Sequence, residues 1–256
     1  MPRPAMTEEQ RMFYEANGYL VIPNALSPEA LTRVRAAADR AEKLWRADTT
    51  RPGWRKQSIE QVMAIIEYDD VFLELMEHRK VFPIVREILG NDISMIDNDY
   101  FISPPGTGSH AGWHSDSGLS GVYGPRSTMM VKVFWLINDV TPDMGPTAVL
   151  PGSHRFPDDF KLPQVSNPGD MPGHKRMAFP AGTAWFFHGR TQHAALDNRS
   201  SEYRRVLIFN YGHFYMKVWQ GYEPSERLKR EAKTSVRRQL LGMGEAYGQA
   251  LKESDV

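Results

Sequence analysis

The middle of this chain consists of short apolar runs, each followed by turn-forming residues, and this pattern limits the folds it can adopt. Between residues 93 and 216, breakers such as Pro104-Pro105-Gly106, Pro151-Gly152 and Pro180-Ala181-Gly182 separate the apolar segments. Many short strands at such spacing are typical of a β sandwich or a β barrel. The candidate strands are Ser94–Ile102, Thr128–Ile137, Thr147–Leu150, Arg176–Phe179, Thr183–Phe187, Gln192–Leu196 and Arg205–Tyr211.

Helical patterns flank this region on both sides. Thr7–Gln10 is a capping box, which predicts a helix that ends near Gly18. Ser27-Pro28 opens a second helix, because Ser is a favoured N-cap and Pro is favoured at the first helical position. A short strand, Tyr19–Ile22, is expected between these two helices. Further helices are expected at Leu73–Met76, at Phe82–Leu89 and beyond Pro224.

We therefore expect one domain, residues 1–256, of the mainly β class with flanking helices. Residues 1–92 would form a helical layer over one face of a β core, residues 93–216, because a sheet must bury its apolar face against another layer. Residues 217–256 would add C-terminal helices.

The composition excludes several classes of function. Basic and acidic residues balance at 31 each, so the charge favours no nucleic-acid partner. The chain has no cysteine, which excludes disulfides, thiolate metal sites and cysteine nucleophiles. The segment Met1–Met6 lacks an apolar signal core, and no apolar run approaches the length of a membrane span. We expect a cytoplasmic protein that binds neither nucleic acid nor membrane; the oligomeric state is left open.

A metal site is indicated by His114-Ser115-Asp116. Residues two apart on an extended segment share a face, so the imidazole and the carboxylate can reach one ion. One more His would complete the two-histidine, one-carboxylate set of non-haem Fe(II) oxygenases, which leaves positions open for co-substrate and O₂. His188 and His193 both follow the candidate strand Thr183–Phe187. His193 is the better candidate of the two, because a polar turn and a strand that begins with arginines follow it. An Arg there could bind a co-substrate carboxylate through its planar fork.

A series of short motifs then extends this pattern from about residue 10 to residue 212. The motifs are Phe13–Pro23, Ser103–Gly106, Trp113–Asp116, Leu136–Asp139, Gly145-Pro146, Pro151–His154, Pro180–Gly182, His193, Asn198 and Arg204. Each is weak alone, but the ordered set resembles the phytanoyl-CoA dioxygenase family of Fe(II)/2-oxoglutarate-dependent oxygenases. The resemblance implies a double-stranded β-helix core, a cupin-like jelly roll, which agrees with the candidate strands.

The resemblance also implies roles for individual residues. His114, Asp116 and His193 match the iron ligands, and Arg204 matches the Arg that binds 2-oxoglutarate. The implied cofactors are Fe(II), 2-oxoglutarate as co-substrate, and O₂. The implied enzyme is a dioxygenase that oxidises, and most often hydroxylates, a small-molecule metabolite, with release of succinate and CO₂. A small metabolite, for example one of natural-product biosynthesis, is expected rather than an acyl-CoA, because basic residues are too scattered to bind the phosphates of an acyl-CoA.

Neighbouring residues raise further expectations about the co-substrate site. Adjacent strand residues face opposite ways, so Arg205 should point away from the iron. Lys132 is a rival for the same carboxylate, but we expect it to point outward into solvent. Some relatives have a hydroxyl two residues after the second His, where this chain has Ala195. Others have Gln on the strand before the first His, where this chain has Asp97 and Asn98. These departures leave the remaining contacts to 2-oxoglutarate open.

Two other functions use the same residues. A cupin-type Zn or Mn hydrolase or isomerase would share the three ligands but would not need Arg204, and a non-catalytic jelly-roll binding module would not need the ligands at all. Loops at 117–127 and 156–175 should set substrate selectivity. Other histidines are expected to be structural or on the surface, namely His78, His110, His154 and His188. Large aromatic residues are expected to lie in the core or to shape the pocket, namely Trp113, Phe134, Trp135, Trp185 and Phe186.

Overall fold

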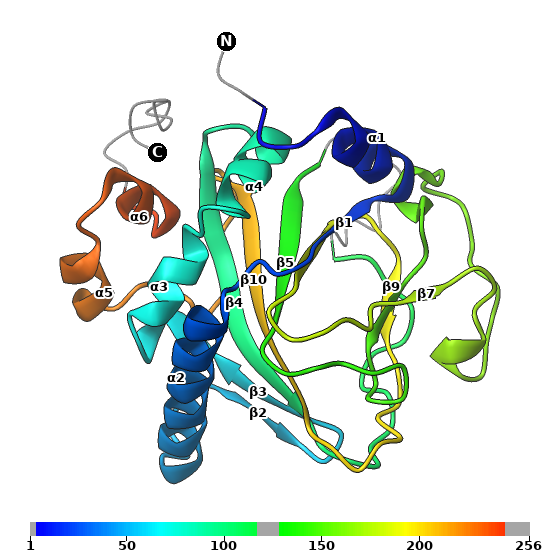
Figure 1. The fold of residues 1–256 in the computed structure, drawn as a ribbon, viewed down its shortest axis with the longest axis horizontal. Coiled ribbons are helices and arrows are strands. Elements are labelled where there is room, and N and C mark those ends of the chain that lie inside the picture. Colours follow the sequence, from blue (N-terminus) through cyan, green and yellow to red (C-terminus); the bar gives the residue numbers. More distant parts are fainter. Residues whose placement is uncertain (1–3, 117–127, 244–256) are drawn as a thin grey trace.

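The computed structural model of the chain describes residues 4–116 and 128–243, and it consists of two antiparallel sheets with helices packed outside them (Figure 1). The expected jelly roll is therefore confirmed. The larger sheet has the order β1-β8-β5-β10-β4-β3-β2 and the smaller one the order β7-β6-β9. The strands are β1 Tyr19–Ile22, β2 Gly53–Lys56, β3 Ile59–Met63, β4 Ile93–Ser103, β5 Met130–Leu136, β6 Thr147–Val149, β7 Lys175–Arg176, β8 Ala184–His188, β9 His193–Ala195 and β10 Arg204–His213.

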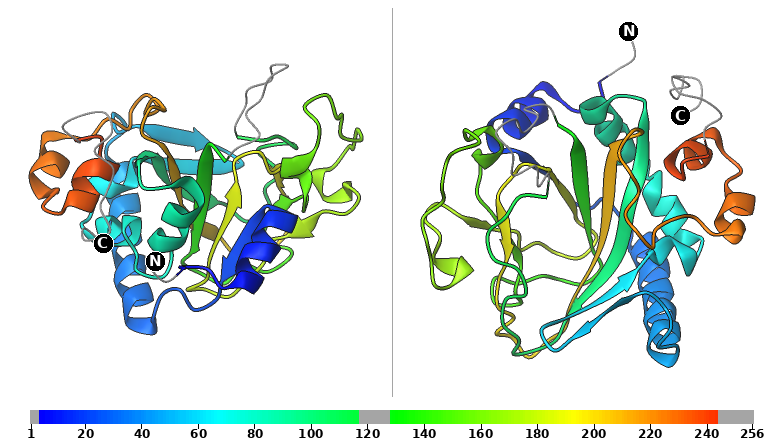
Figure 2. Two further views of the ribbon diagram at one scale, coloured as in Figure 1. Left: turned by 90° about the horizontal axis from the view of Figure 1, so that it is seen from above. Right: turned by 180° about the vertical axis from the view of Figure 1, so that it is seen from behind.

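Most helices lie on one side of the larger sheet, as the two views of Figure 2 show. The sequence-predicted helix starts are correct, because Thr7 caps the first helix with a full capping box and Ser27 caps the second. None of the helices in the described ranges is both long and apolar enough to cross a membrane. The helices are α1 Glu8–Asn17, α2 Pro28–Ala47, α3 Val71–Met76, α4 Phe82–Leu89, α5 Glu226–Glu231 and α6 Ser235–Leu240, with short 3₁₀ turns at Ile65–Glu67, Ser153–Arg155 and Pro168–Asp170.

The central strands of the larger sheet present alternate residues to two different environments. On β5, Val131, Val133 and Trp135 are buried in the cluster that the helices form with the sheet. The residues between them, such as Phe134 and Leu136, belong to a second cluster that also includes residues of the smaller sheet. This two-residue period follows from strand geometry. It leaves the space between the two sheets as the place where inward-facing polar residues meet.

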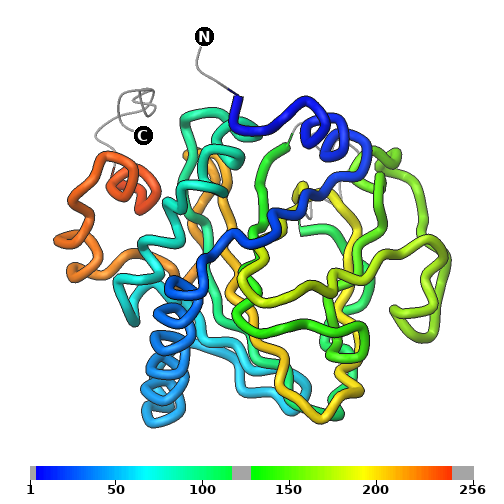
Figure 3. Tube along the Cα trace, viewed as in Figure 1, coloured from blue at the N-terminus to red at the C-terminus, as the bar shows by residue number. Residues whose placement is uncertain are grey.

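The N-terminal region contributes more strand than its sequence indicates. β1 pairs with β8, with Tyr19 opposite Phe187, although the two are far apart in the chain (Figure 3). β2 and β3 form a hairpin that extends the sheet beyond β4. This hairpin was not predicted, because its strands do not alternate cleanly between apolar and polar residues. The helical layer and the β core are thus interleaved in the larger sheet.

Asn198 ties together the ends of two strands that border the site. Its buried side-chain amide donates to the backbone carbonyls of Ser103 at 3.1 Å, Pro104 at 3.0 Å and Glu202 at 2.8 Å. One buried amide thus binds carbonyls from both segments and joins the end of β4 to the turn before β10. The amide therefore sets the path of the chain just before β10, on which Arg204 lies.

Gly18 closes α1 in a conformation that other residues rarely adopt. Its φ is +74°, and a Cβ there would lie 2.4 Å from Nδ1 of His154. We expect Gly18→Ala to lower the free energy of unfolding by about 1–3 kcal/mol through backbone strain alone, and by more through the steric clash. Urea unfolding measures this change. Gly108→Ala is the matched control, because its Cβ would meet no atom within 4 Å and its change should stay within about 0.5 kcal/mol.

Candidate metal centre and active-site cavity

Three backbone hydrogen bonds bring the three predicted metal ligands together. The amide of His114 donates to the carbonyl of His193 at 3.0 Å, and the amide of His193 donates back to His114 at 2.9 Å. The amide of Asp116 donates to the carbonyl of Gly189 at 3.0 Å. This bond fixes Asp116, which is two residues after His114 on the same segment. As a result, one ligand atom from each of His114, Asp116 and His193 lies within 4.8 Å of the others.

The hydrogen bonds of the two imidazoles settle which ring nitrogen can bind a metal. Nδ1 of His114 lies 2.7 Å from the carbonyl of Gly112, and Nδ1 of His193 lies 3.0 Å from that of Thr191. A carbonyl only accepts, so each Nδ1 must carry a hydrogen, and in the neutral imidazole the lone pair for a metal is then on Nε2. Both Nε2 atoms face Asp116, at 3.8 Å from Oδ1 for His114 and 3.6 Å from Oδ2 for His193.

The charge states of the buried ligands also suit a divalent cation. Burial alone would raise the pKa of Asp116, but the charge and hydrogen bond of Lys132 together with the nearby His193 and His114 outweigh burial, and the pKa falls below its ordinary value. Burial lowers the pKa of His193 to about 4. At neutral pH the site therefore offers one carboxylate and a neutral buried imidazole. Two neutral histidines and a carboxylate on one side are the donor set that Fe(II) takes in oxygenases.

The expectation that Lys132 points outward is wrong. Its side chain is only 14% exposed, and Nζ lies 2.9 Å from Oδ2 of Asp116. The reason is the strand period: Val131 and Val133 pack on the helix-covered face, so residue 132 must face the space between the sheets. Burial would lower the pKa of Lys132, but the charges of Asp116 and Asp97 raise it above the ordinary value.

The ligands open onto a cavity of about 380 Å³ between the two sheets. Within the described residues its lining combines acids, bases, amides and aromatic side chains. Across the larger sheet, Asp97, Asn210, Lys132 and Phe187 stand in one row of paired positions. The lining includes Trp54, Gln61, Asp97, Asp99, Phe101, His110, His114, Asp116, Lys132, Phe134, Thr147, His193, Ala195, Arg204, Trp219 and Tyr222.

Arg204 lies in this cavity and Arg205 does not. Nη2 of Arg204 donates to Oγ1 of Thr147 at 3.2 Å, while its buried Nε has no partner among the described residues. Burial lowers the pKa of Arg204 to about 10, so its guanidinium remains charged at neutral pH. Arg205 instead pairs with Asp39 and Glu42 of α2, at 3.3 and 3.6 Å. An uncompensated buried guanidinium is suited to bind a carboxylate.

Thr147 is a site residue that the sequence did not reveal. It pairs across β6 and β9 with Ala195, the position at which some relatives have a hydroxyl. The hydroxyl is thus present on the neighbouring strand, beside the same Arg204. The alternation of the predicted strand beginning at Thr147 could have placed this residue inside. Which residue lies opposite Thr147 depends only on how the strands of the smaller sheet pair.

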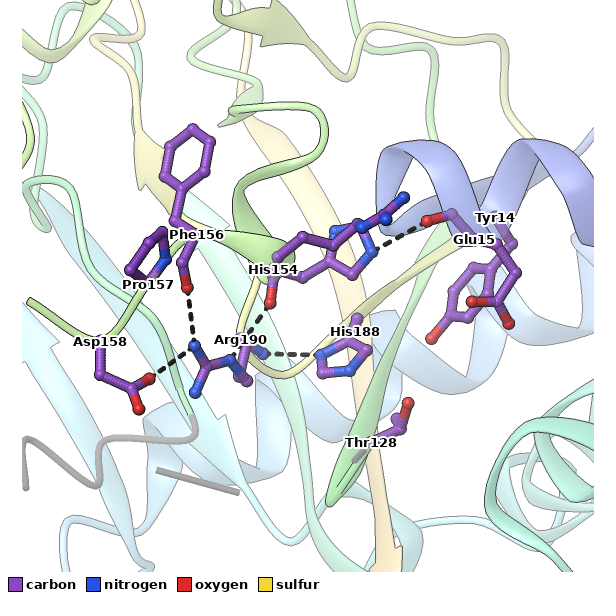
Figure 4. A pocket seen from close by; sticks show the side chains of 10 residues that line it. Tyr14, Glu15, Thr128, His154, Phe156, Pro157, Asp158, His188 and Arg190 are labelled. Carbon is purple, nitrogen blue, oxygen red and sulfur yellow. Dashed lines mark hydrogen bonds and ion pairs between the residues drawn. The ribbon is translucent and has the colours of Figure 1, made fainter. Parts of the chain in front are cut away.

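Two histidines expected to be structural line a different cavity, of about 630 Å³, outside the larger sheet (Figure 4). His188 accepts a hydrogen bond on Nδ1 from the amide of Arg190 at 3.0 Å. His154 contacts the carbonyl of Glu15 through Nε2 at 3.1 Å. Arg190 forms an ion pair with Asp158 at 2.7 Å. His188 faces the helix side of β8, so it cannot compete with His193 for a metal in the inner cavity.

The other expectations concern aromatic residues and loops. Phe134 lines the cavity, while Trp135 and Phe186 are core residues on the helix-covered side. His110 is exposed at the cavity, where its ring stacks on Phe101 at a centroid distance of 6.4 Å. Of the loops expected to govern selectivity, residues 117–127 lie outside the described residues.

Comparison with known proteins agrees with this geometry. Residues 14–206 match the family model of phytanoyl-CoA dioxygenase, PhyH. Ectoine dioxygenase of Stutzerimonas stutzeri is 26% identical over 232 residues, which are 78% of this chain and 74% of that protein. L-proline trans-4-hydroxylase of Streptomyces griseoviridis is 21% identical, over 79% of this chain and 85% of that protein.

Solved structures share the fold. HygX from Streptomyces hygroscopicus, with nickel, 2-oxoglutarate and hygromycin B bound, superposes with a TM-score of 0.69 at 15% identity, over 86% of this chain and 94% of that one. The 2-oxoglutarate-dependent carbocyclase SnoK from nogalamycin biosynthesis superposes with a TM-score of 0.66 at 22% identity, over 83% and 87% of the two chains.

His188 should make stability depend on pH. Burial lowers its pKa to about 4 in the folded chain, while an unfolded His titrates near about 6.5. Between these values the unfolded state binds the proton first, so this residue's contribution to stability is lost as the pH falls from about 7 to 4. We expect the unfolding free energy of His188→Gln to fall less than that of the wild type over this range, by up to about 1.4 kcal/mol per pH unit. Equal pH dependence in urea titrations of the two proteins would refute this assignment.

Proposed function

Since this chain belongs to the phytanoyl-CoA dioxygenase family, we propose that its His114, Asp116 and His193 hold the Fe(II) of an oxygenase active site. The protein is an Fe(II)/2-oxoglutarate-dependent dioxygenase that acts on a small molecule. The family therefore decides against a Zn or Mn hydrolase and against a non-catalytic binding module. The observation that carries the residue assignment is the convergence of these three side chains, from distant segments, on the cavity that also contains Arg204.

The residues around the ligands have separate tasks in this proposal. When bound, Fe(II) with 2-oxoglutarate and O₂ supplies the oxidant that breaks a substrate C–H bond, while 2-oxoglutarate leaves as succinate and CO₂. Arg204 binds the distal carboxylate of 2-oxoglutarate, with the hydroxyl of Thr147 beside it. Lys132 holds Oδ2 of Asp116 at 2.9 Å, which fixes the plane of the carboxylate. The surrounding sheets exclude water from the reacting atoms.

The substrate that we propose is a small metabolite of natural-product metabolism, and hydroxylation is the outcome. A cavity of about 380 Å³ lies at the low end of the range for small-molecule sites. The relatives named above are an ectoine dioxygenase and a proline hydroxylase, which supports a compact substrate. The chain offers only scattered basic residues for the phosphates of an acyl-CoA.

Removing a ligand should remove the metal. We expect His114→Ala and Asp116→Ala to lose stoichiometric binding of Fe(II), measured anaerobically by calorimetry, and to lose conversion of 2-oxoglutarate to succinate. Deleting one of three ligands leaves too few donors for a stable octahedral site. His174→Ala is the matched control, because this His does not line the cavity and its Nδ1 lies 2.6 Å from the carbonyl of Met171. Wild-type metal affinity in either ligand variant would contradict the assignment.

Binding of 2-oxoglutarate should depend on Arg204 far more than on Arg205. Loss of a charged hydrogen-bonding partner costs about 1.5–3 kcal/mol, so Arg204→Gln should weaken 2-oxoglutarate binding roughly 10- to 100-fold. Thr147→Val should weaken it only several-fold, and Thr147→Ser should restore it, because Ser keeps the hydroxyl. The readout is the visible charge-transfer absorption of the Fe(II)–2-oxoglutarate complex, titrated anaerobically.

Arg205→Gln tests whether this effect is specific. Its guanidinium pairs with Asp39 on the helix-covered side of the sheet, so 2-oxoglutarate affinity should stay within about twofold of wild type. An equal loss in Arg204→Gln and Arg205→Gln would show that the effect reflects general destabilisation and would overturn the role of Arg204.

A further inference from the structure

The cavity is lined by more carboxylates than cationic side chains, and bound cofactors would not remove this difference. Within the described residues, three carboxylates line it, Asp97, Asp99 and Asp116, against two cations, Lys132 and Arg204. On the proposed function, the charges of Fe(II) and of the 2-oxoglutarate dianion cancel, so they leave this imbalance unchanged. Lys132 lies against Asp116 at 2.9 Å, and Arg204 faces the distal carboxylate of 2-oxoglutarate. Among the residues that the structure describes, Asp97 and Asp99 are therefore left without a cation of their own.

The strand period of β4 directs both carboxylates into the cavity. Asp97 is 2% exposed and Asp99 is 4% exposed. Oδ1 of Asp99 accepts from the hydroxyl of Tyr222 at 2.6 Å, and Oδ2 accepts from the amide of Gln61 at 2.8 Å. Both donors are neutral, and a carboxylate can accept about four hydrogen bonds. Each oxygen of Asp99 thus keeps acceptor capacity toward a ligand.

A second, unpaired acceptor lies beside Asp97. Asn210 is fully buried at the paired position on β10, and its amide nitrogen donates to Oδ2 of Asp97 at 3.0 Å. Its Oδ1 has no hydrogen-bond partner among the described residues. A buried amide oxygen without a donor costs free energy unless a ligand or water supplies one. Asp97 and Asn210 thus present buried acceptors that a ligand with hydrogen-bond donors would satisfy.

Burial without a counter-ion shifts the ionisation of these groups. Burial raises the pKa of Asp99 well above its ordinary value, and the neighbouring charge of Asp97 raises it further. Burial also raises the pKa of Asp97, although Lys132 opposes the change. A cation brought by a ligand would stabilise the ionised forms, because it replaces the missing charge partner.

The rim of the cavity is aromatic. Trp54 and Trp219 line it and are about half exposed. Phe101 and Phe134 line it further inside. Aromatic faces attract organic cations and also cover their apolar carbon skeleton. Aromatic walls around buried carboxylates are suited to a small molecule with an apolar body and a positively charged end.

We propose that Asp99, together with Asp97, selects a substrate that carries a protonated amine on a small saturated skeleton. The ammonium group donates to Asp99 and to the free Oδ1 of Asn210 beside Asp97, while the carbon skeleton extends toward the iron between the aromatic walls. This inference rests on the proposed function, because it assigns the substrate of that same cavity. Asp99 acts as a specificity residue and takes no part in breaking the C–H bond.

The test compares two probes of nearly equal shape, cyclohexylammonium and cyclohexanol. Each is titrated anaerobically into the protein loaded with Fe(II) and 2-oxoglutarate, and binding is followed by the change in the visible charge-transfer absorption. We expect cyclohexylammonium to bind at least about tenfold more tightly than cyclohexanol, because a charged hydrogen bond is roughly twice as strong as a neutral one. Asp99→Asn should reduce this preference to less than about threefold.

Tyr222→Phe is the matched control, because it removes a neighbour of Asp99 and keeps the carboxylate. It should retain the preference for cyclohexylammonium. Equal binding of the two probes to wild type, binding of neither, or an unchanged preference in Asp99→Asn would each overturn the inference. If Asp99→Asn does not fold, the wild-type comparison and Asp97→Asn still decide the question.

The same experiment distinguishes failure of the proposed function from failure of the ammonium preference. The charge-transfer absorption forms with Fe(II) and 2-oxoglutarate before any probe is added. If it does not form, the metal assignment fails, while the shift in melting temperature of the metal-free protein still reports which probe the cavity prefers. If it forms and the probes bind equally, only the ammonium preference is wrong.

Discussion

The central strands of the larger sheet pack against different layers on their two faces, and the rest of the molecule depends on this constraint. One set of alternate residues packs against the helices and carries most of the large apolar side chains. The other set faces the smaller sheet, where apolar residues at one end give way to acids, amides and bases around the metal ligands. Because the period of a strand is two residues, the helix-covered face decides which residues enter the cavity. Val131 and Val133 thereby place Lys132 inside, beside Asp116.

The metal centre depends on this frame rather than on a continuous motif. His114 and His193 are joined by reciprocal backbone hydrogen bonds, and Asp116 is held by Gly189. Backbone hydrogen bonds thus fix the segments that carry the ligands, and the carbonyls of Gly112 and Thr191 orient the rings. Such preorganisation lowers the entropic cost of binding. The same cavity concentrates uncompensated charge, with Arg204 suited to an anion and Asp99 suited to a cation.

Local sequence patterns predicted much of this arrangement. The capping residues Thr7 and Ser27 marked helix starts correctly, and the candidate strands all coincide with observed ones to within a few residues. The hairpin of β2 and β3 was not predicted, because its stability comes from pairing with β4 rather than from its own pattern. Lys132 was placed wrongly, since a lysine among apolar residues is usually solvated. Only the packing of Val131 and Val133 on the helix-covered face shows that the side chain of Lys132 points inward.

The sequence by itself determined most of the strand and helix elements, the spacing of His114 and Asp116, and the ordered motifs that identify the family. These are local or sequential properties, set by backbone preference and residue type. The tertiary structure alone decided which side chains share the cavity: Thr147 beside Arg204, Lys132 against Asp116, and Asp99 beneath Tyr222. Those contacts join residues far apart in the chain. They arise from strand register and sheet packing, which no short stretch of sequence encodes.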